Sequence, residues 1–286
     1  MNISETDLIL NADGSAYHLN LLPGDIADTI ILVGDQYRVP EVSKHFDSVE
    51  LRKGKREFVT HTGTLAGKKI SVVSTGIGTD NIDIVLNELD ALVNVDFNTR
   101  KINKELRVLN LVRIGTSGAI QANIPIDSLL VSEHAFGLDA LMHYYQHNLS
   151  TGEAQLLESF SVLIPNHKPY ITSASNLLIK SLSAGLSKGV TVTSPGFYSP
   201  QGRTLRAQST LPALLAQLQN FDYQGKIITN LEMETAGIYG LANILGHHAI
   251  SYNVILANRI TNTFSKQPMA TMEKFIVEVL SRIASL

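Results

Sequence analysis

Short runs of β-branched and other apolar residues recur along the chain and predict buried strands. Several runs are apolar at consecutive positions, which is typical of strands covered on both faces. The runs are 29–33, 70–73, 108–114, 128–132, 190–194, 226–229 and 250–257. Between them, apolar residues at three- and four-residue spacing predict amphipathic helices. These stripes are Ile82, Val85, Leu86, Leu89 and Val93; Leu211, Leu214, Leu215 and Leu218; and Met272, Phe275, Ile276, Val279, Leu280 and Ile283.

The alternation of strands and helices predicts an α/β fold with a central mixed, mostly parallel sheet flanked by helices. No linker, repeat or charge block interrupts the pattern, and the Pro- and Gly-containing stretch 194–203 is too short to separate domains. We therefore expect a single domain over residues 1–286. A helix that starts near Glu234 is expected to end at Gly246.

Composition excludes several classes of function. The formal net charge of −3 gives no basic field for nucleic acid. Cysteine is absent, which excludes disulfides, thiolate catalysis and cysteine-ligated metal sites. The first residues, MNISETDLILNADG, lack the features of a signal peptide, and no stretch approaches the roughly 20 apolar residues of a membrane helix. We expect a cytoplasmic protein without nucleic-acid or membrane partners.

Three glycine-containing turns are expected directly after three of the strands. They are VGDQYR after 29–33, STGIGTDN after 70–73, and GTSGAI after 108–114. Ligands of open α/β sheets bind at the carboxyl ends of strands, often near helix N-termini, so the turns could converge on one site. Glycines that merely permit tight turns are the alternative. The absence of GxGxxG and Walker motifs argues against a dinucleotide or a nucleoside triphosphate.

Arginines near these turns are candidates for holding an anion such as phosphate. Guanidinium groups bind phosphate in bidentate fashion and keep their charge. Arg38 follows the first turn, Arg56 lies in the segment GKREF, and Arg113 precedes Gly115. Each could instead be a surface residue, although Arg113 lies in an apolar strand, where an unpaired charge is unfavourable.

Two further segments carry chemistry that suits a nucleoside. In NLEMET, Glu232 and Glu234 flank Met233, and their carboxylates could accept hydrogen bonds from the vicinal hydroxyls of a sugar. The helix dipole offers an alternative reason for acidic residues at a helix start. No histidine stands beside them at ligand spacing, so we expect no metal. In the 194–203 segment an aromatic ring could stack on a base, and an amide could pair with the edge of a cyclic imide.

Seven segments occur in an order that resembles the nucleoside phosphorylase family, which contains uridine phosphorylases and bacterial hexameric purine nucleoside phosphorylases. They are ILVGDQYRV, KREF, VVSTGIG, VRIGTSGAIQ, FYSPQGR, NLEMET and ILANR. The resemblance, which begins near AYHL at 16–19, implies the family's fold and a nucleoside phosphorylase, closest to uridine phosphorylase. The implied reaction converts uridine and phosphate to uracil and ribose 1-phosphate in nucleoside salvage. Phosphate is then a co-substrate, and no cofactor is expected.

The resemblance also implies a role for each candidate residue. The phosphate site comprises Gly34, Arg38, Arg56, Arg113 and Thr116; the ribose site His18, Glu232, Met233 and Glu234; and the base site Phe197, Gln201 and Arg203. Arg113, Gln201 and Arg203 are the implied catalytic residues. His18 and Arg56 are implied to reach the site of a neighbouring subunit, so a homodimer is the expected minimal unit, and the family also forms hexamers.

The base remains the most open part of this interpretation. Purine enzymes of the family and related nucleosidases carry an Asp after the last core strand, where this chain has Asn258 and Arg259. Together with Gln201 and Arg203, this favours uridine. The chain departs from the better-known uridine enzymes at Thr79–Asn81, where they have Gly-Pro-Ser. A purine nucleoside phosphorylase, a nucleosidase and a non-catalytic nucleoside-binding protein remain alternatives.

Overall fold

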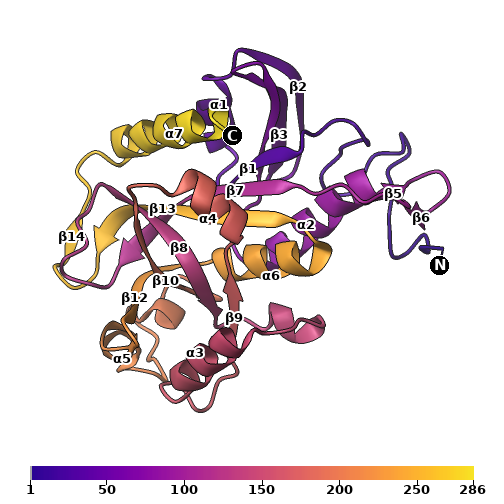
Figure 1. Ribbon diagram of the computed structural model, residues 1–286. Coiled ribbons are helices and arrows are strands. Elements are labelled where there is room, and N and C mark those ends of the chain that lie inside the picture. Colours follow the sequence, from indigo (N-terminus) through magenta and orange to yellow (C-terminus); the bar gives the residue numbers. More distant parts are fainter. Residues whose placement is uncertain (1) are drawn as a thin grey trace.

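The computed structural model describes residues 2–286, and strands and helices alternate through it (Figure 1). The helices are α1 (Arg38–Ser43), α2 (Thr79–Asn94), α3 (Thr151–Ser161), α4 (Asn176–Leu182), α5 (Leu214–Gln219), α6 (Thr235–Leu245) and α7 (Pro268–Ala284), with short 3₁₀ helices at Leu141–Tyr144 and Ser199–Gln201. The strands are β1 (Thr29–Val33), β2 (Ser48–Lys55), β3 (Phe58–Leu65), β4 (Lys68–Ser74), β5 (Val95–Asp96), β6 (Lys101–Ile102), β7 (Asn110–Ala119), β8 (Ser128–Gly137), β9 (Tyr170–Ser173), β10 (Ser187–Thr193), β11 (Asp222–Tyr223), β12 (Lys226–Glu232), β13 (His248–Asn258) and β14 (Thr263–Phe264).

A mixed sheet of 12 strands forms the centre of the molecule, which confirms the expected α/β class. Its main path runs β11-β12-β10-β8-β13-β7-β1-β4-β3-β2, with β14 on β13 and β9 on β8. Strand β1 is parallel to β4 and β7, and β13 is parallel to β7. The β2–β3–β4 edge is antiparallel, and so are the short strands β9, β11 and β14 with their partners.

Five strands of this sheet close into a ring, because β12 also pairs with β7. The ring runs β7-β13-β8-β10-β12 and returns to β7. Side chains alternate between the two faces of a strand, so every second residue of each strand faces the inside. The buried residues that meet there are polar: Arg113, Ser117, Ser132, Thr191, Thr193, Asn230, Glu232, Ser251 and Asn253.

Helices cover the sheet on both sides, and β1 is therefore buried on both faces. Ile30 and Leu32 pack into the hydrophobic cluster that contains α2 and α6. Ile31 and Val33 pack into the cluster with α1, α4 and α7. Burying each such side chain stabilises the fold by about 1.5–3 kcal/mol. This core holds the carboxyl ends of β1, β4 and β7 together.

The third expected turn is wrong, because residues Gly115–Gly118 are part of a strand. Strand β7 continues to Ala119, paired with β13 along this stretch and with β12 at its end. Pairing on both sides outweighs the turn preference of glycine here. Gly115 is instead needed for space: a Cβ there would lie 2.1 Å from Nη1 of Arg113, whose guanidinium folds back over the strand.

The other two turns are confirmed. Gly34 directly follows β1. Gly76 and Gly78 follow β4 with φ of 71° and 97°, a backbone region that favours glycine, and Gly78 is the N-cap of α2. The two turns lie at the carboxyl ends of β1 and β4, which are neighbouring parallel strands.

The helix predictions are largely confirmed. Glu234 is the N-cap of α6, and Gly246, at φ 79°, is its C-cap. Helix α5 is shorter than its apolar stripe, since it begins at Leu214 and leaves Leu211 outside. Seven strands were not predicted: β2, β3, β5, β6, β9, β11 and β14. Strand β2 was missed because its sequence, SVELRKGK, is largely polar. None of the helices within residues 2–286 combines the length and low polarity that crossing a bilayer requires.

Candidate active site

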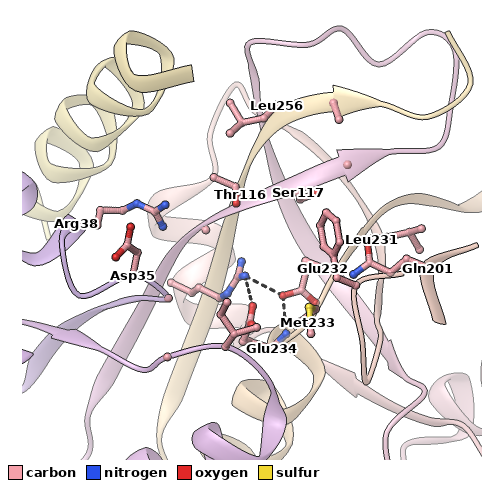
Figure 2. A pocket seen from close by; sticks show the side chains of 18 of the residues that line it. Asp35, Arg38, Thr116, Ser117, Gln201, Leu231, Glu232, Met233, Glu234 and Leu256 are labelled. Carbon is pink, nitrogen blue, oxygen red and sulfur yellow. Dashed lines mark hydrogen bonds and ion pairs between the residues drawn. The ribbon is translucent and has the colours of Figure 1, made fainter. Parts of the chain in front are cut away.

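One cavity of about 740 Å³ opens at the carboxyl ends of the central strands. Its wall is built from the ends of β1, β4, β7, β12 and β13 together with the segment after β10 (Figure 2). All the residues predicted from the sequence line it, except His18 and Arg56. Those that do are Gly34, Arg38, Arg113, Thr116, Phe197, Gln201, Arg203, Glu232, Met233 and Glu234.

Arg113 is buried and forms ion pairs with both predicted carboxylates. Its Nη2 lies 2.6 Å from Oε2 of Glu234 and 3.1 Å from Oε2 of Glu232. Its Nη1 lies 3.4 Å from both Ser251 Oγ and Asn253 Oδ1. Burial disfavours the charge, but the two carboxylates outweigh it and raise the pKa of Arg113. The expected unfavourable charge in an apolar strand is thus resolved by pairing.

Glu232 is largely committed to the protein itself. Its Oε2 accepts hydrogen bonds from the backbone N–H of Glu234 and from the N–H and hydroxyl of Thr235, each at 2.9 Å. Its Oε1 accepts from the Thr193 hydroxyl at 2.5 Å. The carboxylate therefore satisfies N–H groups at the start of α6, which the helix-terminus alternative anticipated.

Glu234 keeps more capacity for a ligand. Its Oε1 accepts from the backbone N–H of Gly78 at 2.9 Å, and its Oε2 accepts from Arg113. Each oxygen retains a second lone pair. Burial raises the pKa of Glu234; Arg113 opposes the rise and Glu232 adds to it.

Arg38 is a cation of the cavity wall that is left available for a ligand. Within residues 2–286 its side chain makes no hydrogen bond or ion pair, although Asp35 lies beside it in Figure 2. Burial lowers the pKa of its guanidinium, an effect that Asp35 opposes. An unpaired guanidinium in a cavity is suited to an anionic ligand.

Phe197, Gln201 and Arg203 form one unit on another part of the wall. Nη1 of Arg203 donates to Oε1 of Gln201 and to the carbonyl of Phe197, both at 2.7 Å. Its guanidinium lies 3.8 Å above the Phe197 ring centre. Burial and, secondarily, Arg259 lower the pKa of Arg203 to about 10, so it remains cationic at neutral pH. Because Arg203 occupies the Gln201 oxygen, the Gln201 NH₂ group is the part left to face a ligand.

The residues after β13 support this unit. Arg259 donates to the carbonyls of Gln201, at 2.9 Å, and Gly202, at 3.3 Å. Asn258 donates to two backbone carbonyls at 2.9 and 2.8 Å and accepts from two backbone N–H groups at 3.0 and 3.1 Å. Asn258 is therefore a fully bonded structural residue.

His18 and Arg56 lie outside the cavity of their own chain. Arg56 is exposed at the β2–β3 turn with φ 56°. Nδ1 of His18 lies 2.6 Å from Oε1 of Glu88. Their assignment to a neighbouring subunit's site stays a prediction.

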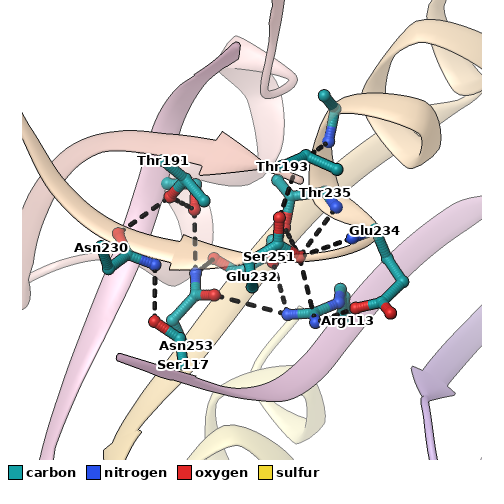
Figure 3. Close-up of polar contacts among 12 residues, drawn as sticks. Arg113, Ser117, Thr191, Thr193, Asn230, Glu232, Glu234, Thr235, Ser251 and Asn253 are labelled. Carbon is teal, nitrogen blue, oxygen red and sulfur yellow. Dashed lines mark hydrogen bonds and ion pairs between the residues drawn. The ribbon is translucent and has the colours of Figure 1, made fainter. Parts of the chain in front are cut away.

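The sequence interpretation missed several lining residues and the polar interior of the strand ring. The cavity also contacts Asp35, Gln36, Glu57, Ile77, Asn81, Ser117, Leu256 and Phe264. Figure 3 shows the polar side chains of the ring converging beside Arg113. A signal was present, because polar residues occupy alternate positions in VTVTS, NLE and ISYNV. Within residues 2–286, no three His, Cys, Asp or Glu side chains gather as metal ligands would.

Comparisons with known proteins identify the family. A family model described as the phosphorylase superfamily matches residues 28–286. A uridine phosphorylase of Thermococcus kodakarensis is 33% identical over 89% of this chain and 81% of its own. A DeoD-type purine nucleoside phosphorylase of Listeria monocytogenes is 27% identical over 92% of this chain and 97% of its own.

A solved structure of a related enzyme is similar to this chain over almost its whole length. It is a Trypanosoma brucei nucleoside phosphorylase described as showing uridine phosphorylase activity, with a TM-score of 0.87 and 28% identity over 98% of this chain and 100% of its own. The resemblance inferred from the seven sequence segments is thus confirmed. His18 precedes the range that the family model matches.

Proposed function

The chain belongs to the phosphorylase superfamily, and we propose that it catalyses the phosphorolysis of uridine to uracil and ribose 1-phosphate. One observation carries the proposal: a single cavity joins the unpaired cation Arg38 to the Phe197–Gln201–Arg203 unit. The first offers an anion site and the second a site for a flat base with carbonyl oxygens. Relatives named uridine phosphorylase support this choice.

In this proposal, phosphate binds at the carboxyl ends of β1 and β7. Arg38 is its principal ligand, since its guanidinium donates no hydrogen bond within residues 2–286, and Gly34 and Thr116 also line the cavity. Arg113 offsets one of the two carboxylate charges beside the phosphate position. Glu234 accepts the ribose 2′-hydroxyl, while Glu232 holds the start of α6 and Met233 packs against the sugar.

The reaction follows from charge and position. A phosphate oxygen attacks C1′ from the face opposite the base, and the C1′–N1 bond breaks with its electron pair passing to uracil. The phosphate dianion stabilises the positive charge that develops on ribose. Gln201 and Arg203 stabilise the negative charge on the leaving base. No covalent enzyme intermediate is needed, because positioning and pre-organised donors perform the catalysis, at roughly 3 kcal/mol per well-placed donor.

The geometry favours uracil over a purine as the leaving base. A purine benefits from an acid that protonates the ring, and the position after β13 holds Asn258, whose amide is fully bonded to backbone. The purine nucleoside phosphorylase relatives keep a purine substrate as the second candidate.

The test is base release from uridine, inosine and adenosine, each with and without phosphate. We expect fast, phosphate-dependent release of uracil and formation of ribose 1-phosphate. Equal rates without phosphate would exclude phosphorolysis and favour a nucleosidase. A preference for inosine would overturn only the uridine assignment, and binding without turnover would indicate a nucleoside-binding protein.

We further propose a homodimer as the minimal active unit, acting in nucleoside salvage in the cytoplasm. The support is that Arg56 and His18, implied for the site by family resemblance, lie outside the cavity of their own chain. Two equivalent sites across a two-fold axis would then each take residues from both chains.

Subunit mixing tests this arrangement. Arg38→Ala and Arg56→Ala are each expected to be nearly inactive alone. After the two variants are unfolded and refolded together, one site of a mixed dimer carries both defects and the other carries neither. Random pairing makes about half of the dimers mixed, so roughly a quarter of the wild-type activity should return. If mass measurement confirms mixed dimers but activity does not recover, Arg56 does not act across the interface.

A further inference from the structure

The polar residues inside the strand ring form a continuous hydrogen-bonded path that begins and ends on β7. Each strand of the ring contributes to it, and Figure 3 labels all of its members except Ser132. In order, it runs Arg113, Asn253, Ser132, Thr191, Asn230, Ser117. The four intermediate residues are fully buried, whereas the two ends line the cavity.

The direction of donation along this path is determined at Arg113. A guanidinium can only donate, so the amide oxygen of Asn253 must face it. The Asn253 NH₂ group then donates to Ser132 Oγ at 2.8 Å. Ser132 Oγ has Thr191 Oγ1 as its other partner, at 2.5 Å, so its proton goes to Thr191.

The same direction continues to the cavity. The Thr191 hydroxyl donates to Asn230 Oδ1 at 2.9 Å, and the Asn230 NH₂ group donates to Ser117 Oγ at 2.7 Å. Ser117 therefore accepts from Asn230. Within residues 2–286 its hydroxyl has no other side-chain or backbone partner, so its proton is left to point into the cavity.

Ser117 lies toward the base half of the cavity. In Figure 2 it lies on the side of Thr116 that faces Leu231 and Gln201, and the next residue, Gly118, pairs with Leu231 of β12. Two residues after Ser117, the carbonyl of Ala119 accepts a hydrogen bond from the backbone N–H of Arg259 at 2.9 Å. Arg259 in turn holds the carbonyls of Gln201 and Gly202.

We propose that the ring is a one-directional relay that presents the Ser117 hydroxyl as a hydrogen-bond donor to a carbonyl oxygen of the base. Asn253, Ser132, Thr191 and Asn230 are positioning residues, since they act only through Ser117. The relay also joins Arg113 to the base half of the cavity. This inference rests on the proposed uridine phosphorolysis and adds a residue that selects for a base with a carbonyl acceptor.

The experiment compares uridine with 2-thiouridine and 4-thiouridine, because sulfur is a weak hydrogen-bond acceptor. Wild-type turnover of uridine with phosphate is measured first, and its absence would overturn the proposed function itself. Ser117→Ala should lower kcat/KM for uridine about tenfold, as expected for one lost hydrogen bond to developing charge. For the thio-analogue altered at the carbonyl that Ser117 contacts, the loss should be no more than about twofold. Equal losses on all three nucleosides, or a rise in the phosphate KM alone, would overturn the proposal.

The relay is tested by reversing its direction. Asn253→Asp replaces the NH₂ donor with an oxygen, so the Ser132 hydroxyl would donate to it. Each later hydroxyl and amide would then reverse its direction of donation. As a result, the Ser117 hydroxyl would donate to Asn230 and not into the cavity. The preference for uridine over the thio-analogue should then fall as in Ser117→Ala, about fivefold. Ser251→Ala is the matched control, since Ser251 Oγ also lies 3.4 Å from Arg113 Nη1 but stands outside the path. This control should keep the preference even where it changes the phosphate KM.

A second pair of variants covers the case in which Asn253→Asp does not fold. Thr191→Val cuts the path at its midpoint and should reduce the uridine preference. Thr229→Val removes the other hydroxyl that reaches Asn230 Oδ1, at 2.8 Å. This variant should leave the uridine preference unchanged, because Thr229 lies beside the path and the Thr191 donor to Asn230 Oδ1 remains. If both valine variants behave alike, the relay does not control Ser117.

Discussion

Replacing Arg113 with alanine is expected to reduce both catalysis and folding stability, the largest combined effect of any single change in the site. The guanidinium pairs with two carboxylates that are 4% and 6% exposed, and its loss leaves both buried charges without an ion-pair partner. Breaking such a buried pair typically lowers the free energy of unfolding by about 3–5 kcal/mol. Loss of the positive charge beside phosphate should also lower kcat/KM about 10²–10³-fold.

The stability loss in this variant should depend on pH. Burial already raises the pKa of Glu234 above its ordinary value, and Arg113 opposes that rise. Without Arg113 the folded-state pKa moves further up, so the folded chain binds more protons than the unfolded chain between the two pKa values. The free energy of unfolding therefore falls as pH rises through that window, and the deficit should be larger at pH 8 than at pH 5.

Urea unfolding at both pH values and phosphate kinetics measure these effects. Arg107→Ala is the control, since its ion pair with Asp28 is half exposed and is worth only about 0–1 kcal/mol. Wild-type stability in Arg113→Ala would contradict the stabilising role of the buried ion pairs. An unchanged phosphate KM in the same variant would contradict the role of Arg113 at the phosphate site.

Arg203→Ala is expected to lower kcat/KM for uridine by about 10²–10³-fold with little change in the phosphate KM. The effect exceeds the loss of one ligand, because Arg203 also orients the Gln201 amide and packs over the Phe197 ring. The segment is partly exposed, so the free energy of unfolding should change by less than about 1 kcal/mol.

Arg206→Ala supplies the matched control, being an exposed arginine three residues further on that does not line the cavity. It should retain wild-type kinetics. If Arg203→Ala and Arg113→Ala raise the phosphate KM equally, the division of the cavity into base and phosphate halves is incorrect.

Local patterns in the sequence were sufficient for the α/β class, for seven of the strands, including all five of the ring, and for the ends of α6. These features depend on burial and on glycine backbone preferences, which act over a few neighbouring residues. The chemistry of single residue types likewise identified the lining arginines, the Glu232–Glu234 pair and the Gln201–Arg203 unit as candidates. Family resemblance then assigned their roles.

Only the tertiary structure decided how these groups are partnered. Glycine-rich residues 115–118 form a strand because β13 and β12 pair with it, which no local signal reveals. Arg113 and Glu234 lie 121 residues apart in the chain yet form an ion pair, whereas the Arg38 side chain forms none within residues 2–286. Closure of five strands into a ring turns alternating Ser, Thr and Asn residues into one directed hydrogen-bond path. Pairing and polarity of this kind depend on contacts between distant strands, and those exist only once the sheet has formed.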